Sequence, residues 1–468
     1  MSRKSLSFEA YVYYASATRS AEQSVAAGRF QNRERTALRN PSTKEATAKP
    51  DLAGGLPPDE STPTSQRDEP AKNEVLNPVP YLSSLEADNA AHSARVATWG
   101  SVAYLIVTDI FGPSQAPWSF AQMGHGPGFL LYTAIGGLST YSGWLLWKIF
   151  IGLDAEQHPI RNYADIFERL FGTRMKHFVN ISQVIQLIPP PYKRLHGLRQ
   201  TDSQRGVLDV VATLNGLNQA MLCFGGTSLF IFFLAEMRRP MDFWKSLFCA
   251  QFFIYTLYVV FGMFVYHWHG QFTYTPAMQG ISNLRWQTTL NAITLFTNLI
   301  STGLYGNIGL KILYIEVLEP LCNFPVLNSS SGRVRWSILS PVFWSVGFIV
   351  AGAIPQLAYV SSLAAALFTV MFTYSLPALA AIVFWSRKDA MMPNEQFDPT
   401  TGTFSFQDQG FQRYYRGFMQ RPFLNIFNII YFLSGLVCCA LGCYAAIFQL
   451  TTAFQNGVAT SFTCKSPV

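Results

Sequence analysis

Charged side chains are scarce in this chain. Aspartate, glutamate, lysine and arginine make up only 13% of its 468 residues, against 49% hydrophobic residues. A soluble domain carries about 25% charged residues, so this composition excludes an ordinary soluble enzyme or binding domain. The net charge of +7 comes from basic residues spread over short loops between apolar runs, not from one dense patch. We therefore expect a protein of the lipid bilayer, with no nucleic acid as its partner.

Motifs for catalysis and metal binding are also lacking. The chain has seven cysteines, and their spacing fits no metal site. Five of them lie inside apolar runs, where cysteine acts as a small buried hydrophobe: Cys223, Cys249, Cys438, Cys439 and Cys443. The sequence contains no phosphate-binding loop, no metalloprotease motif and no nucleophile-elbow serine. We expect a protein that is not an enzyme, with no catalytic residue, no cofactor and no metal ion.

Long apolar runs dominate the chain from residue 98 onward. Runs of about 20 residues are long enough to cross the hydrocarbon core as helices. Eight runs have this length: Thr98–Gln122, Pro127–Gly152, Ala212–Glu236, Ser246–Trp268, Gln287–Tyr314, Ser337–Ile354, Tyr359–Trp385 and Leu424–Leu450. The sequence thus predicts an all-α integral membrane protein with a transmembrane domain at residues 96–450. Residues 1–95 are polar, which predicts a disordered tail, and residues 451–468 form a short C-terminal tail.

The distribution of arginine and lysine predicts the topology. Basic loops stay inside, which places the N-terminal tail in the cytoplasm. This assignment requires one more crossing between residues 177 and 212, where only Phe178–Ile188 is apolar. Those residues reach roughly 16 Å as a helix, about half of the hydrocarbon core. Three prolines then begin an atypical polar insert at residues 189–206. We expect about eight full spans plus one partial span.

Two of the full spans are interrupted near their middle. Asp109, Gly112 and Pro113 interrupt the first span, and residues 224–227 (Phe-Gly-Gly-Thr) interrupt the third. Glycine and proline unwind a helix, and free backbone at membrane depth is tolerated only where it is buried in protein or lines a cavity. A pair of interrupted spans is the best sequence indication of a transporter's binding site at the bilayer midplane.

Several segments resemble the fungal branch of the amino acid/auxin permease family. They include TDIFGPSQAPWSFAQMGHGPG, AEMRRPMDFWKSLFCAQFFIY and GLYGNIGLKILY, and the resemblance covers about residues 97–188 and 206–450. It implies a leucine-transporter-like inverted repeat of five plus five helices, in which the two interrupted spans are helices 1 and 6. By the same resemblance Phe178–Ile188 is the first half of helix 3. The rest of helix 3 and helices 4 and 5 are absent, so the first repeat is incomplete.

The resemblance also assigns candidate site residues. It places the unwound backbone of the first break opposite that of the second. The free N–H groups of the first break then bind a substrate carboxylate. The carbonyl groups that the glycine pair frees in the second break take an amino group or a cation. The predicted substrate-binding residues are Thr108, Asp109, Ile110, Gly112, Ser114, Phe224, Gly225, Gly226 and Thr227, and those for a coupling ion are Asp109, Ser301 and Thr302. The alternative for both breaks is a packing kink that binds no ligand.

Asp109 itself allows two interpretations. A carboxylate at membrane depth is expensive and usually faces a cavity, a proton path or a partner. Asp109 is therefore a candidate for proton coupling or for binding the substrate amine. The alternative is a neutral, hydrogen-bonded aspartate that stabilises the kink.

The combined hypothesis is a secondary transporter of amino acids that works by alternating access around the two breaks. By the resemblance we expect a neutral amino acid as substrate and a proton, rather than sodium, as coupling ion. The plasma membrane and the vacuolar membrane both remain open, as does the oligomeric state. The alternative hypothesis is a membrane sensor that does not transport, or a truncated, non-functional paralogue.

Overall fold

The computed structural model is almost entirely helical. It describes residues 6–39, 95–110, 112–187, 207–274, 277–327, 329–353, 363–395, 397–398, 403–408 and 410–455. In these ranges the strands are the two-residue pair β1 (Phe397–Asp398) and β2 (Thr403–Phe404), which is antiparallel. The predicted insert at 189–206, tail residues 40–94 and residues 456–468 lie outside the described part of the chain. The prediction of an all-α membrane protein is confirmed as far as the helical content and the apolar helices are concerned.

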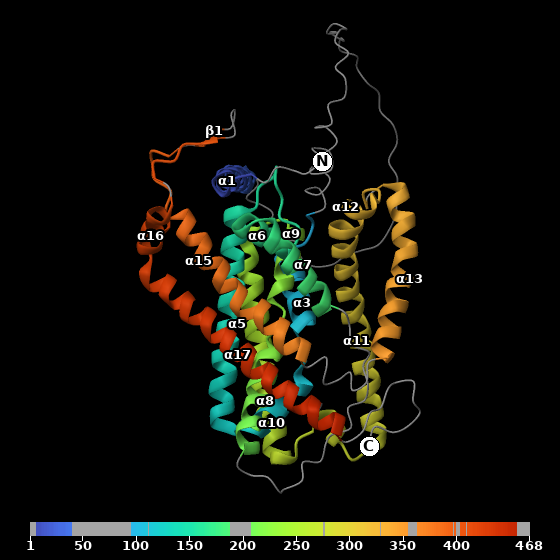
Figure 1. Ribbon diagram of the computed structural model, residues 1–468. Helices are drawn as coiled ribbons and strands as arrows, with labels where there is room; N and C mark the ends of the chain where they lie inside the picture. The colour runs from blue at the N-terminus through green and yellow to red at the C-terminus, as the bar shows by residue number, and fades with distance from the viewer. Residues whose placement is uncertain are drawn as a thin grey trace.

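Long helices surround the two interrupted ones (Figure 1). The long helices are α5 (His125–Leu153), α10 (Phe243–His269), α11 (Leu284–Leu313), α13 (Ser330–Ala353) and α17 (Pro422–Gln455), and the shorter α15 (Leu376–Lys388) packs among them. Helix α10 packs on α5 and on both halves of the first interrupted helix, while α17 packs on α15. In Figure 1, α11 and α13 stand together on one side of the bundle. The apolar core therefore gathers around the interrupted helices.

Shorter elements connect these helices. They are α6 (Tyr163–Phe171), α7 (Thr173–Leu187), α12 (Glu319–Cys322), α16 (Phe411–Gln420), the 3₁₀ turns η3 (Pro240–Asp242), η4 (Gly270–Phe272) and η5 (Ala277–Gly280), and the π-helical turns η6 (Tyr314–Leu318), η7 (Ala365–Thr369) and η8 (Met371–Ser375). A π-helical turn inserts an extra residue into a helix and is frequent at functional sites. Two such turns follow one another directly before α15.

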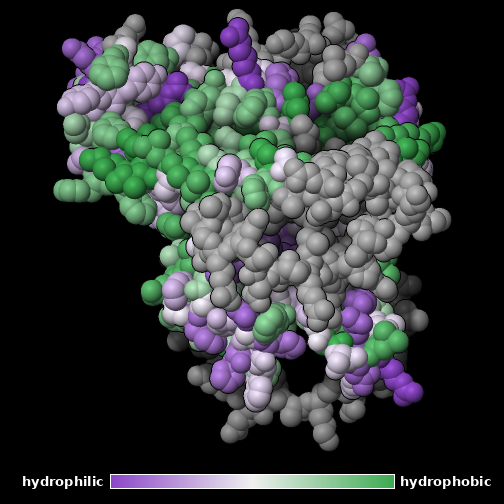
Figure 2. Space-filling model, turned by 60° about the horizontal axis from the view of Figure 1, so that its bottom comes forward, coloured by the Kyte–Doolittle hydropathy of each residue, from purple (hydrophilic) through white to green (hydrophobic). Residues whose placement is uncertain are grey.

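Four helical segments in the described part of the chain are long and apolar enough to cross a membrane. They are Gly216–Glu236, Pro240–Phe272, Ala365–Lys388 and Pro422–Phe448. The outer sides of such helices carry exposed apolar residues: Phe252 is 72% exposed and Phe423 is 89% exposed. Figure 2 shows side chains of this kind gathered in broad hydrophobic areas on the surface. Helices also occupy the other predicted spans, and the count of eight full spans stays a prediction.

Both interrupted spans are broken where the sequence has its glycines. The first consists of α3 (Trp99–Ile110), the 3₁₀ turn η1 (Pro113–Gln115) and α4 (Ala116–Met123). The second consists of α8 (Val207–Cys223), η2 (Thr227–Leu229) and α9 (Phe230–Glu236). Gly226 has a φ of +134°, a conformation that residues with a Cβ rarely adopt. The second break therefore depends on glycine at this position.

The N-terminal segment differs from its prediction. Residues 8–39, which we expected to be disordered, form the helix α1 (Phe8–Arg39), and its first part packs against α5 and α6. Phe8, Ala10 and Ala15 are buried in this contact. The composition of the whole polar segment concealed this short apolar face, which lies within the first turns of the helix. The expectation of disorder is therefore wrong for residues 8–39.

The conformation of Gly226 leads to a stability prediction. A Cβ at this position would lie 2.7 Å from the Oδ2 atom of Asp109, in addition to the unfavourable φ. We expect Gly226→Ala to lower the free energy of unfolding by about 1–3 kcal/mol, visible as a lower apparent melting temperature in detergent. Gly137→Ala in α5 is the control, because an added Cβ there meets no atom within 4 Å. Equal melting temperatures for the two variants would contradict the prediction.

Candidate functional site

The two breaks meet at the side chain of Asp109. Its Oδ1 atom accepts a hydrogen bond of 2.5 Å from the hydroxyl of Tyr305 in α11. Its Oδ2 atom is buried and has no hydrogen-bond partner in the described part of the chain. This oxygen points at the second break, where it lies close to the backbone of Gly226. The carboxyl group of one interrupted helix thus faces the unwound backbone of the other.

One tyrosine hydroxyl joins the backbone of both breaks. Tyr258 of α10 is fully buried. Its hydroxyl accepts a hydrogen bond from the Gly112 N–H (2.9 Å) and lies 2.5 Å from the Ile110 carbonyl oxygen and 3.2 Å from that of Cys223. A phenol has a single proton, so it donates to one of the two carbonyls at a time. Tyr258 therefore supplies partners for polar groups that the missing helical turns leave free.

The backbone of the second break is held by two hydroxyl groups. The buried Ser139 of α5 donates to the Phe224 carbonyl over 3.0 Å. The Gly226 N–H donates to the Thr373 Oγ1 atom over 3.4 Å. Gly225 approaches Thr369 so closely that an added Cβ would lie 2.3 Å from its Cγ2 atom. This break therefore rests on α5 on one side and on the two π-helical turns on the other.

The π-helical turns also provide carbonyl groups near the site. The Thr227 hydroxyl lies 3.4 Å from the carbonyl oxygens of both Phe372 and Thr373 in η8. The Tyr163 hydroxyl donates to the Phe372 carbonyl over 3.2 Å. The irregular backbone of η8 thus lies directly beside the irregular backbone of the second break, and both are buried in protein as polar backbone at membrane depth must be.

The structure brings some of the predicted residues together and separates others. Asp109, Ile110 and Gly112 meet the second break through Gly226 and the Tyr258 hydroxyl. The Thr108 hydroxyl donates to the Leu105 carbonyl within its own helix, so it is already engaged. Ser114 lies half-buried in η1.

The predicted coupling-ion residues lie close in sequence to Tyr305, which contacts Asp109. Ser301 and Thr302 are on α11, one helical turn before Tyr305. The hydrogen bond to Asp109 comes from Tyr305. The role of Ser301 and Thr302 therefore stays a prediction. In the described ranges no group of three or more histidine, cysteine, aspartate or glutamate residues is placed to hold a metal ion.

Sequence reasoning missed the hydroxyl groups that hold the breaks. Tyr258, Tyr305 and Thr373 were not among the predicted residues. A signal was available for the two tyrosines, since each lies inside a long apolar run. A buried tyrosine hydroxyl usually finds a hydrogen-bond partner. An unwound backbone with free donors and acceptors is such a partner.

The chain is similar to known membrane proteins. A sequence profile described as transmembrane amino acid transporter protein matches residues 95–189 and 194–406, which include both breaks. A transmembrane transporter of Gibberella moniliformis is 27% identical over 170 residues, 36% of this chain and 35% of the relative. One of Fusarium pseudograminearum is 23% identical over 240 residues, 51% of this chain and 44% of the relative. This chain thus spans less than half the length of each of these relatives.

The Tyr258 hydroxyl leads to a second prediction. Tyr258→Phe leaves buried polar groups of both breaks without their partner, which costs about 1–3 kcal/mol per group. We expect a clear fall in the apparent melting temperature. Tyr255→Phe is the matched control on the same helix, because in the described part of the chain the Tyr255 hydroxyl bonds the exposed Thr133 hydroxyl (2.8 Å) and no group of either break. A larger fall for Tyr255→Phe than for Tyr258→Phe would contradict the assigned role of Tyr258.

Proposed function

This chain belongs to the transmembrane amino acid transporter family, and from that premise we propose that it is a secondary transporter of amino acids. The observation that supports this proposal best is the meeting of the two helix breaks at Asp109. Both breaks lie in segments that match the family. Interrupted helices of this kind form the substrate site of transporters with inverted repeats.

The proposed fold is the leucine-transporter-like inverted repeat. In this arrangement α3 and α4 are the two halves of helix 1, and α8 and α9 are the two halves of helix 6. Transport proceeds by alternating access, in which the half-helices on either side of the breaks tilt in turn to open one end of the pathway. The unwound residues between the halves absorb the change in backbone angles, as hinges do.

The substrate is a neutral amino acid in this proposal. Its carboxylate binds N–H groups of the first break, where Ser114 is half-buried and the Gly112 N–H exchanges the Tyr258 hydroxyl for the substrate. Its amino group binds near the Oδ2 atom of Asp109 and the carbonyl groups of the second break. The apolar ring of Phe224, which is fully buried beside these groups, favours an uncharged substrate side chain.

The isolation of Asp109 supports a proton as the coupling ion in this proposal. The carboxyl group has one hydrogen-bond donor, Tyr305, and no basic partner in the described part of the chain. A charged, unpaired carboxylate at membrane depth is costly. In the proposed cycle Asp109 therefore carries a proton when the site is empty, or pairs with the ammonium group of the substrate. Sodium at Ser301 and Thr302 is the alternative coupling ion.

The host membrane is part of the proposal as well. The basic loops favour a cytoplasmic N-terminus, and we propose the plasma membrane or the vacuolar membrane of the cell as the place of action. Both membranes separate compartments of different pH, so both supply the proton gradient that the proposed coupling requires.

Uptake into proteoliposomes tests the role of Asp109. The protein is reconstituted with an inward proton gradient, and entry of radiolabelled neutral amino acids is measured. We expect Asp109→Asn to reduce gradient-driven uptake by at least about tenfold, the effect of roughly 1.4 kcal/mol, and to remove its dependence on pH. Asp242→Asn, at an exposed pair with Lys245, is the control that leaves uptake unchanged. Unaltered uptake and pH dependence in Asp109→Asn would contradict proton coupling through this residue.

The same preparation separates transport from sensing. A bound amino acid stabilises the folded protein by mass action, so its binding raises the apparent melting temperature. Binding together with uptake supports the transporter, whereas binding without uptake identifies a sensor. Neither binding nor uptake, in a correctly folded preparation, would identify a non-functional paralogue.

A further inference from the structure

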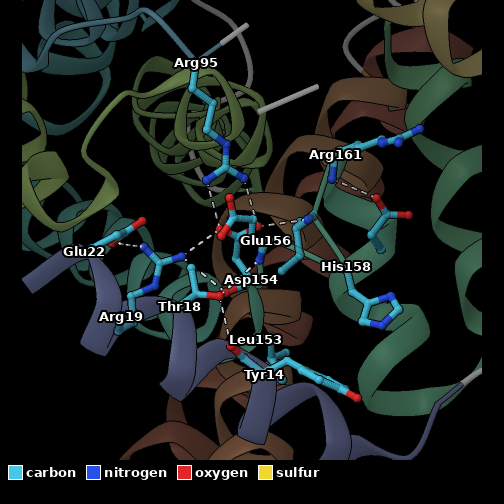
Figure 3. Close-up of polar contacts among 12 residues, drawn as sticks. Tyr14, Thr18, Arg19, Glu22, Arg95, Leu153, Asp154, Glu156, His158 and Arg161 are labelled. Atoms are coloured by element: carbon cyan, nitrogen blue, oxygen red, sulfur yellow. Dashed lines mark hydrogen bonds and ion pairs between the residues drawn. The ribbon is translucent and has the colours of Figure 1, made fainter. Parts of the chain in front are cut away.

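A buried carboxylate outside the substrate site holds two arginines from different parts of the chain. Asp154, at the end of α5, is fully buried. Its Oδ2 atom accepts a hydrogen bond from Arg19 of α1 (2.8 Å), and both of its oxygens accept one from Arg95 (3.1 Å each). Figure 3 shows the two guanidinium groups turned towards this one carboxylate. Asp154 therefore joins α1 to the segment that enters the first interrupted helix.

The cluster is balanced in charge. Glu22 of α1 pairs with Arg19 over 2.7 Å, so two carboxylates face two guanidinium groups. The Ile160 N–H donates to Asp154, and Arg19 also donates to the Asp154 carbonyl at the C-terminal end of α5. Cations are favourable at that end of a helix. A buried ion pair with these partners is expensive to break from one side.

Aromatic contacts hold the first turns of the same helix. The Phe8 ring lies 6.1 Å from the Phe384 ring of α15, and the guanidinium of Arg169 in α6 lies 4.4 Å from the Tyr11 ring. Tyr14 contacts the rings of His158 and Phe397. Helix α1 therefore lies across α5, α6, α15 and β1, and it fastens these elements to one another.

Arg95 connects helix α1 to the ends of both interrupted helices. Two residues after Arg95, the Ala97 N–H donates to the Glu236 carbonyl (3.1 Å), and the Arg238 N–H donates to the Ala97 carbonyl (2.9 Å). This bridge ties the start of α3 to the end of α9. Asp154, which binds both Arg95 and Arg19, therefore connects this bridge to α1.

We propose that α1 is a latch that keeps this end of the transport pathway closed. While Arg19 and Arg95 share Asp154, the start of α3 cannot move away from α9 without breaking its contact with a carboxylate that α1 also holds. Release of α1 leaves the bridge anchored by Arg95 alone, which shifts the population towards the open state. The consequence for transport rests on the proposed function, whereas the joining of α1, α3 and α9 rests on the contacts themselves.

Hydrogen exchange of the bridge amides tests the latch in the full chain. Exchange is followed by mass spectrometry in nanodiscs, on peptides that contain the N–H groups of Ala97 and Arg238. Local opening sets the exchange rate of such amides. We expect Arg19→Ala, which breaks one side of the buried cluster, to speed their exchange by about tenfold or more, and Arg19→Lys to retain most of the protection.

A second variant weakens the latch without changing any charge. Phe8→Ala removes the contact with Phe384 and is expected to speed exchange of the same amides. If Arg19→Ala does not fold, Phe8→Ala is the variant that tests the latch. Ser16→Ala on the exposed side of α1 is the matched control and leaves exchange unchanged. Exchange within α10 also stays unchanged, because the opening is local.

Two results would overturn the latch. One is bridge exchange that stays at the wild-type rate in both Arg19→Ala and Phe8→Ala. The other is a uniform increase over the whole chain, which indicates general loss of stability. Hydrogen exchange does not depend on transport, so the two proposals fail separately. Faster exchange at the bridge in a protein without any uptake supports the latch and refutes the transporter.

Discussion

Polar backbone groups inside a bilayer must find partners within the protein, and the arrangement of this chain depends on that constraint. Each interrupted helix leaves N–H and carbonyl groups that no helical turn satisfies. The Tyr258 hydroxyl lies within hydrogen-bonding distance of backbone groups in both breaks, and Ser139 and Thr373 bond the second. These side chains come from α5, α10 and η8. The surrounding helices thus supply the hydrogen-bond partners that the backbone of the two breaks requires.

The same constraint bears on the proposed substrate site at the breaks. Groups that are held by hydroxyls, rather than locked into helical turns, can exchange one partner for another at modest cost. Asp109 extends this principle to a side chain, since one oxygen is held by Tyr305 and the other faces Gly226 without a partner. An amino acid presents a carboxylate and an ammonium group, which complement free N–H groups, carbonyls and this unpartnered oxygen.

The sequence predicted the breaks better than their surroundings. Gly112, Pro113, Gly225 and Gly226 act on their own backbone, so their effect is local and visible in the chain. The partners Tyr258 and Tyr305 depend on which helix faces which, and no periodicity in the sequence specifies that. Helix α1 was missed for a different reason: its few apolar residues were averaged into a long polar segment. Its docking through Arg19 depends on a carboxylate 135 positions away in the sequence.

The position of a bound amino acid tests the central claim, that the two breaks form one substrate site. Electron cryomicroscopy of the protein in nanodiscs with a saturating neutral amino acid locates the ligand directly. We expect density between the two breaks, with the carboxylate at N–H groups of the first break and the ammonium group beside Asp109 and Gly226. A ligand bound elsewhere in the protein, with Tyr258 still bridging Gly112 and Cys223, would contradict it.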